Sequence, residues 1–336
     1  MGGSSLYRLK DNNCRKRPQE FCTYWIFIVC ITFIPCDGWT EGGDWFSSPT
    51  AQHTDCRYQT SSINTTRSEG DLFHSIGLPD DDVFTPLLAA PKEPKFVGGY
   101  QRVRFRDANE SLNVGIISAG GTFGLWGHRH EINCDGLQFS LFGAIFSQFN
   151  LDADSTDLIN SDFQVGFPLT WRRGSVSTRL RVYHQSSHVG DEFLLRNPGF
   201  NRVNLGFEAV EVLVSLDPSW WRVYAGGSYL IRRSPALDRG VIQWGLESRA
   251  IPRAAPILSR VMEGVLVAPV LGADFQSFQQ FSWNLNTSIM GGFEWSRVGS
   301  TRRYRLLLSY YRGHNPFGQF FDQNIQTYGI GLYIEI

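Results

Sequence analysis

From Phe96 to the end of the chain, apolar and polar residues alternate in successive segments that are separated by turn-forming residues. Alternate residues of a β-strand lie on opposite faces, so each segment would have one apolar face and one polar face. Twelve such segments are expected, near residues 96–106, 112–119, 137–149, 159–171, 175–187, 201–215, 220–232, 241–249, 264–277, 283–295, 303–312 and 325–336. An even number of strands of roughly ten residues is typical of bacterial outer-membrane barrels. We therefore expect an all-β fold, a closed antiparallel transmembrane β-barrel over residues 96–336.

A soluble β-sandwich also has alternating strands, so alternation alone does not decide between the two architectures. Aromatic residues gather toward the expected strand ends, as they do at membrane interfaces; they are Trp171, Trp220, Trp221, Trp283, Trp295 and Tyr310. The polar phase of the strands is rich in arginine and glycine, which suits a polar lumen. These two features favour the membrane barrel over the sandwich.

The lumen of such a barrel is expected to hold charged side chains of both signs. Its arginines would be Arg179, Arg181, Arg202, Arg222, Arg232, Arg303 and Arg305. Their acidic partners would be Asp162, Glu208, Glu247 and Glu294. Ion pairs of this kind favour a plugged lumen over an anion-selective pore.

The N-terminal part of the chain has the composition of an export signal. Basic residues precede an apolar run over residues 21–35, and small or turn-forming residues follow it. This order predicts a secretory signal peptide over residues 1–38; the alternative is an N-terminal anchor helix. The predicted location is the outer membrane of a Gram-negative-type bacterium, with membrane lipids and the barrel-insertion machinery as partners. The formal net charge of −1 gives no reason to expect a nucleic-acid partner.

Residues 39–95 are expected to form a polar extension in front of the barrel. The segment has no sustained periodicity, except for a short helix expected at 84–90 and a polar hinge expected at 92–95. Cys56 and Cys134 are the cysteines left after removal of the signal peptide, and an oxidising compartment would allow them to pair.

A histidine and a serine stand at the end of one apolar strand face. Leu180, Val182, His184 and Ser186 share a phase, so the last two would face lipid at the rim of the barrel. With the N-terminus in the periplasm, the connection over 187–200 would be extracellular. For a single polar residue at a strand end, a place in the interfacial belt explains the position without any catalytic role.

The next segment supplies a third polar group. Asn201 falls in the phase of Val203, Leu205, Phe207 and Ala209, which we expect to face lipid beside His184 and Ser186, with Glu208 on the lumen side. Ser186 would then be the nucleophile, His184 its base, and Asn201 the residue that orients the imidazole. Asn197 is an alternative third member, and His188 an alternative base.

The hairpin residues Tyr183-His184-Gln185-Ser186 and Phe200-Asn201-Arg202, with the last hairpin around Tyr310 and Tyr328, resemble the outer membrane phospholipase A family. The resemblance implies a twelve-stranded barrel that hydrolyses phospholipid acyl esters with a lipid-facing Ser-His-Asn site. It also implies calcium bound near that site and a homodimer. Asp191 and Glu192 are the candidate calcium ligands, although they do not match the family's ligands one for one. Ser187 and His188 also depart from that family's pattern.

The run from Tyr183 to Leu194 is also similar to a family of uncharacterised bacterial exported barrels with a domain of unknown function. That resemblance extends from about Phe84 to the end of the chain. The sequence is therefore consistent with two functions. One is acyl-ester hydrolysis of membrane lipids, and the alternative is a non-catalytic barrel that serves as a channel, receptor or envelope component.

Overall fold

In a computed structural model of the chain, the described residues are 73–108, 110–130, 133, 135–250, 252–254, 264–297, 300 and 302–335. The expected signal peptide, most of the expected polar extension, and both Cys56 and Cys134 lie outside them. Contacts divide the chain into two units, Met1–Ala51 and Gln52–Ile336, and everything described below belongs to the second. No helix among the described residues is long and apolar enough to cross a membrane.

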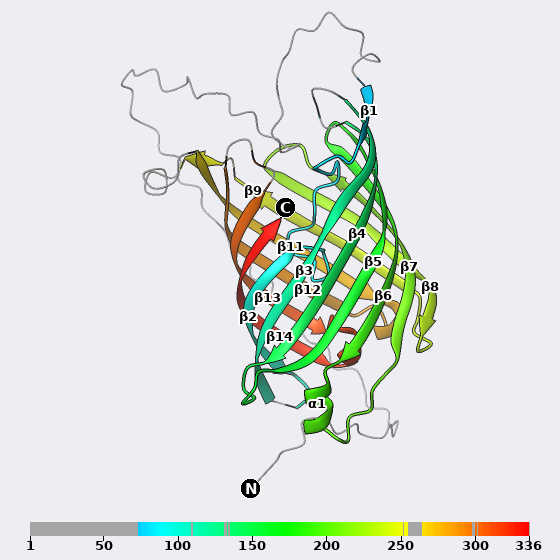
Figure 1. The fold of residues 1–336 in the computed structure, drawn as a ribbon, viewed down its shortest axis with the longest axis vertical. Helices are drawn as coiled ribbons and strands as arrows, with labels where there is room; N and C mark the ends of the chain where they lie inside the picture. The colour runs from blue at the N-terminus through cyan, green and yellow to red at the C-terminus, as the bar shows by residue number, and fades with distance from the viewer. Residues whose placement is uncertain are drawn as a thin grey trace, which may run out of the picture. The chain divides into compact units, whose positions relative to one another are not determined.

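Twelve long antiparallel strands form the body of this unit (Figure 1). They are β2 (Phe96–Phe105), β3 (Glu110–His130), β4 (Gly136–Asn150), β5 (Asp157–Arg173), β6 (Val176–Val189), β7 (Leu205–Leu216), β8 (Trp221–Ser234), β9 (Gly240–Arg249), β11 (Val265–Phe278), β12 (Leu285–Arg297), β13 (Arg303–His314) and β14 (Asn324–Glu335). Each strand pairs with its neighbours, and β2 pairs with β14, so the hydrogen bonding runs around a closed ring. The expected closed barrel of twelve antiparallel strands is confirmed.

Two short strands and a short helix complete the described elements that matter here. β1 (Phe73–Gly77) pairs with the far part of β3, and β10 (Arg253–Ala254) pairs with β11. The helix α1 (Asp191–Arg196) follows β6. We call the end of the barrel that carries α1 the loop end; it lies at the bottom of Figure 1. The connections over 190–204, 235–239, 279–284 and 315–323 lie at this end.

β3 is much longer than the expected strand, which stopped at residue 119. The glycine-containing residues that follow continue the strand between β4 and β1. A Cβ atom at Gly120 would lie 2.5 Å from the Cβ of Ala144, and one at Gly124 would lie 2.5 Å from Pro79. Glycine is therefore required by close packing across β3 and not by a change of chain direction.

The two faces of most strands are as expected. On β5, Val165 and Phe167 are about half exposed on the outside, whereas Asp162 and Gln164 are buried inside. A closed ring of strands with an apolar exterior and a polar interior is the architecture of an outer-membrane-type barrel.

Residues 78–95, which we call the plug segment, fill part of the lumen. Phe84 and Leu87 pack with Leu213 and Tyr224 of the barrel wall. Farther along, Leu88 belongs to a second buried cluster with residues of β11 to β14. Apolar contacts therefore attach the plug segment to the inner face of the barrel wall.

The expected helix at 84–90 is wrong, and so is the polar hinge at 92–95. The segment consists of bends and extended chain. The N–H of Leu88 donates to Oε1 of Glu247 at 2.6 Å, and Pro86 has no N–H to donate. The barrel wall therefore satisfies a backbone group that a helix would bond internally. Glu93 and Lys95 are buried, because the lumen gives them charged and carbonyl partners.

Ion pairs connect the plug segment to the wall. Glu93 bonds to Arg179 at 2.6 Å, and Arg179 also pairs with Glu211 at 3.0 Å. Lys92 bonds to Asp162 at 2.7 Å. Further lumenal pairs join Arg172 to Asp217, Arg181 to Glu211, Arg222 to Glu247, Arg249 to Glu294, and Arg305 to both Glu294 and Glu335.

Glu93 makes the plug segment sensitive to acid. Burial alone would raise the pKa of its carboxyl group, but Arg179 outweighs burial and lowers the pKa from 4.5 to about 2. Because this pKa is lower in the folded protein than in the unfolded chain, the ionised carboxylate adds to the free energy of unfolding. The contribution is complete above pH 4.5 and is lost as the pH falls toward 2. Replacing Glu93 by Gln should lower the free energy of unfolding at pH 7 by about 3 kcal/mol.

The prediction is checked by guanidinium unfolding in lipid vesicles at pH 7, 4.5 and 3. The two unfolding free energies should converge as the pH falls, because only the wild type has this contribution to lose. Glu192→Gln, at an exposed acid, should match the wild type throughout. A constant gap between wild type and Glu93→Gln from pH 7 to pH 3 would contradict the assignment.

Candidate active site on the outer wall

His184 and Ser186 lie on the outer face of β6, as expected. Leu180 and Val182, in the same phase, are exposed by 39% and 47%, and the His184 side chain is exposed by 46%. Positions two residues apart on a strand are separated by roughly 7 Å, so an imidazole that leans toward the serine can span the gap.

Glu208 of β7 is the cross-strand partner of His184. Its Oε1 lies 3.3 Å from Nδ1 of His184, and both side chains are substantially exposed. A methyl group at Gly206 would lie 3.9 Å from Cε1 of His184, and Gly206 is the cross-strand partner of Ser186. The imidazole therefore leans toward the rung of Ser186 with Nδ1 on the carboxylate. Among the described residues nothing is hydrogen-bonded to its Nε2 or to the Ser186 hydroxyl.

The expected face of the next strand was wrong. β7 begins at Leu205, and Leu205, Phe207 and Ala209 turn to the lumen, while Glu208 turns outward. Both faces of this strand have apolar residues, because its inner face packs against the plug segment and the loop-end connections. Apolarity therefore does not distinguish lipid from lumen here.

Asn201 is not on β7 at all. It lies in the connection before the strand and is exposed, and no contact joins it to His184 among the described residues. Asn197 donates its side-chain amide to the carbonyl of Phe193 at the end of α1. The ring of His188 packs edge-on against Phe163 at 5.6 Å. None of the three is brought to the His184–Glu208 pair.

Two of the arginines expected in the lumen lie elsewhere. Arg202 is in the exposed connection before β7. Arg232 is exposed on β8, where it is the cross-strand partner of Glu208. His184, Glu208 and Arg232 therefore form a polar row across three strands.

Among the described residues, the candidate calcium ligands are not grouped with other acids. Asp191 and Glu192 are exposed in the first turn of α1. Across the part of the chain that the structure describes, no three His, Cys, Asp or Glu residues are grouped so that they could hold a metal ion. Asp191 and Glu192 alone do not supply the roughly six to eight oxygen ligands that a calcium ion takes.

Contacts inside the barrel stabilise the part of the wall that carries the polar row. The connection between β13 and β14 folds over the lumen, where Gln319 donates to the carbonyls of Ser187 and Val203, both at 2.8 Å. The N–H of Gly318 donates to Asp162 at 3.0 Å. Phe320 packs with Phe193 and Phe200 of the β6–β7 connection. These contacts fix the ends of β6 and β7, and with them the outer polar row.

Several solved structures resemble this barrel at low sequence identity. The calcium-bound dimer of the outer membrane phospholipase of Salmonella typhi is 11% identical, covers 75% of this chain and 94% of its own, and has a TM-score of 0.47. Outer membrane phospholipase A from Escherichia coli is 11% identical over 75% of this chain and 93% of its own, with a TM-score of 0.47. An anion-selective porin from Comamonas acidovorans is 10% identical over 71% of this chain and 98% of its own, with a TM-score of 0.30. Such likeness concerns the fold alone.

No curated protein matches the sequence. A family described as "Protein of unknown function (DUF1207)" matches residues 46–335, which include every barrel strand. The chain belongs to this DUF1207 family.

Proposed function

We propose that this protein is a bacterial outer-membrane barrel that hydrolyses acyl esters of membrane lipids on its outer wall. Ser186 is the nucleophile, His184 the general base, and Glu208 the residue that orients the imidazole. The observation that carries the proposal is the 3.3 Å contact between Nδ1 of His184 and Oε1 of Glu208, on the same face as Ser186. A carboxylate on Nδ1 fixes the tautomer that leaves Nε2 able to accept a proton.

The reaction follows from these positions. Ser186 Oγ bonds to the ester carbonyl carbon while its proton passes to Nε2 of His184. The ester C–O bond then breaks, and the departing lysolipid oxygen takes that proton. A water molecule that gives its proton to His184 attacks the acyl-serine, and the fatty acid leaves as Ser186 recovers a proton.

The position of the polar row on the barrel gives it access to lipid esters. The row lies where the exposed apolar face of β6 gives way to polar residues, so an acyl ester at the boundary between acyl chains and headgroups can reach Ser186. Arg232 offers an exposed guanidinium beside Glu208, and this group suits a lipid phosphate. We place the loop end on the cell exterior, because long connections of outer-membrane barrels lie there.

The proposal is tested with a fluorophosphonate probe, which bonds covalently to activated serines. Full-length protein in phospholipid vesicles should be labelled, and peptide mass spectrometry should locate the adduct on Ser186. Glu208→Gln keeps a hydrogen-bonding group but removes the charge that stabilises imidazolium, so the labelling rate should fall by about 100-fold. Asn201→Ala should be labelled at the wild-type rate.

The outcome distinguishes the competing interpretations. If labelling depends on Asn201 and not on Glu208, the residue that orients the His184 imidazole is Asn201 and not Glu208. Absence of label on Ser186 in folded, vesicle-inserted protein would leave the non-catalytic barrel as the function.

A further inference from the structure

The inner side of the barrel contains a second feature, a cavity of about 170 Å³ between the plug segment and the wall. Two exposed residues of the loop-end connections, Asp238 and Gln280, are part of its lining, so it reaches solvent at the loop end. A continuous wall of paired strands separates the cavity from lipid. A ligand therefore arrives from the aqueous side.

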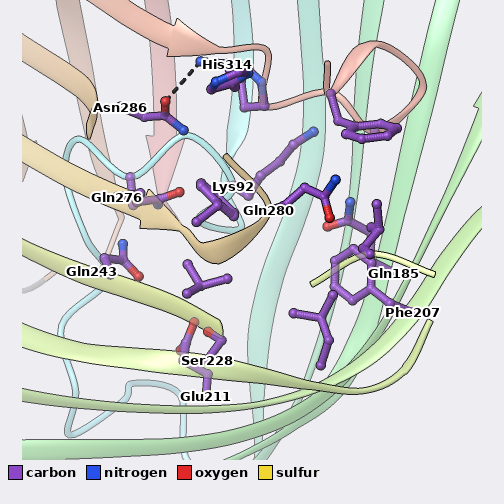
Figure 2. A pocket seen from close by; sticks show the side chains of 18 of the residues that line it. Lys92, Gln185, Phe207, Glu211, Ser228, Gln243, Gln276, Gln280, Asn286 and His314 are labelled. Atoms are coloured by element: carbon purple, nitrogen blue, oxygen red, sulfur yellow. Dashed lines mark hydrogen bonds between the residues drawn. The ribbon is translucent and has the colours of Figure 1, made fainter. Parts of the chain in front are cut away.

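Several amide side chains line the cavity, among them Gln185, Gln243, Gln276 and Asn286 (Figure 2). The amide nitrogens of Gln243 and Gln276 donate to Asp274 at 2.7 Å and 3.0 Å. Each fixed nitrogen leaves the oxygen of the same group as an acceptor for another partner.

Two other amides are held the opposite way. Oδ1 of Asn286 accepts the N–H of His314 at 2.9 Å, which leaves its Nδ2 as a donor. Oε1 of Gln185 accepts from Gln164 at 2.7 Å, which leaves its Nε2 as a donor. The cavity therefore offers oriented acceptors and donors, at positions fixed before any ligand binds.

The buried charges of the lining are already paired. Glu211 and Glu93 bond to lumenal arginines, and Lys92 bonds to Asp162. A charged ligand would have to displace one of these buried pairs, which is costly. A neutral ligand leaves them intact.

Aromatic rings supply part of the remaining wall. Phe281 stacks on the imidazole of His314 with ring centroids 3.6 Å apart, and Phe207 faces the same space (Figure 2). Flat apolar rings together with amide donors and acceptors match a molecule whose hydroxyls both donate and accept and whose C–H groups form an apolar face.

We propose that this cavity binds a neutral saccharide that enters from the loop end. The binding site lies on the inner face of β6 and the neighbouring strands, whereas the proposed active site lies on the outer face. The saccharide site therefore does not depend on the proposed hydrolase activity.

The experiment uses full-length protein in a sugar-free detergent, with maltose, lactose and N,N′-diacetylchitobiose as probes and glucuronate as a charged comparison. Saturation-transfer NMR detects binding, and titration gives Kd. The wild type should bind at least one neutral probe and should not bind glucuronate. Gln276→Met removes an acceptor while Gln243 and Tyr224 still bond to Asp274, and it should weaken binding about tenfold.

A second variant and a control complete the test. Asn286→Asp keeps the acceptor for the His314 N–H but loses the donor, so it should also weaken binding about tenfold. Gln326→Met changes an amide that bonds to Tyr328 away from the cavity lining, and should bind as the wild type does. Failure of the wild type to bind any neutral probe would overturn the proposal, as would unchanged binding in both cavity variants.

Discussion

Replacing Ser186 by Ala should reduce fatty-acid release from phospholipid vesicles by about 10³-fold or more. The reason is that covalent catalysis by a serine acts as a unit with its base, and loss of the nucleophile removes the acyl-enzyme route entirely. The measurement is the rate of fatty-acid release by purified, vesicle-inserted protein.

The matched control removes a hydroxyl from the same face of the same strand. Thr178→Ala changes a partly buried outward residue of β6 that no described contact connects to His184, so its rate should equal that of the wild type. If Ser186→Ala and Thr178→Ala release fatty acid equally, the nucleophile assignment is wrong. Guanidinium unfolding of each variant separates a loss of chemistry from a loss of fold.

The second large effect concerns the lumen. Replacing the plug segment, residues 78–95, by a Gly-Ser linker of equal length should convert a barrel that blocks ions into one that conducts them. The segment places Phe84, Leu87, Leu88 and Glu93 against inward residues of the wall, and a linker without these side chains leaves that space to water. Single-channel recording in planar bilayers measures the change.

A reversal experiment serves as the control. A synthetic peptide of residues 78–95 should reduce the conductance of the linker variant, because its buried side chains find their original partners. Conductance of the wild type equal to that of the linker variant would show that the segment does not block the lumen. Heat-modifiable migration on gels establishes that both proteins are folded barrels.

The strands were predictable because their signal is local. Membrane strands must satisfy every backbone group by pairing, and their outward residues meet lipid, so alternation such as that of Phe163, Val165 and Phe167 reports the fold directly. The position of His184 and Ser186 on the outer face followed from the same alternation.

The rest depended on contacts between distant segments. β7 has apolar residues on both faces, since Leu213 meets Phe84 and Leu87 inside the barrel while Val212 and Val214 face outward. Alternation therefore placed Glu208 on the lumen face, and the role of orienting the His184 imidazole was assigned to Asn201. Counting rungs across the hairpin would have found Glu208 only if the first residue of β7 had been known.

The plug segment escaped prediction for a related reason. Its partners lie 89 residues ahead for Val83 and 159 residues ahead for Leu88, so no local pattern marks them. Pro86 and the short apolar run around it resemble a helix start, but the lumen offers the backbone other partners. A buried, irregular segment is stable only where the surrounding wall satisfies its polar groups.

The pairing of β2 with β14 also has a consequence for how the molecule is made. The first strand of the barrel, β2, can pair on this side only with the last strand, β14. Phe105 is the partner of Ile325, and Phe96 is the partner of Ile334. A growing or truncated chain that lacks these last residues exposes two open sheet edges, which hydrocarbon does not tolerate. The barrel can therefore close only when both strands are present, and residues 78–95 lie inside the closed ring.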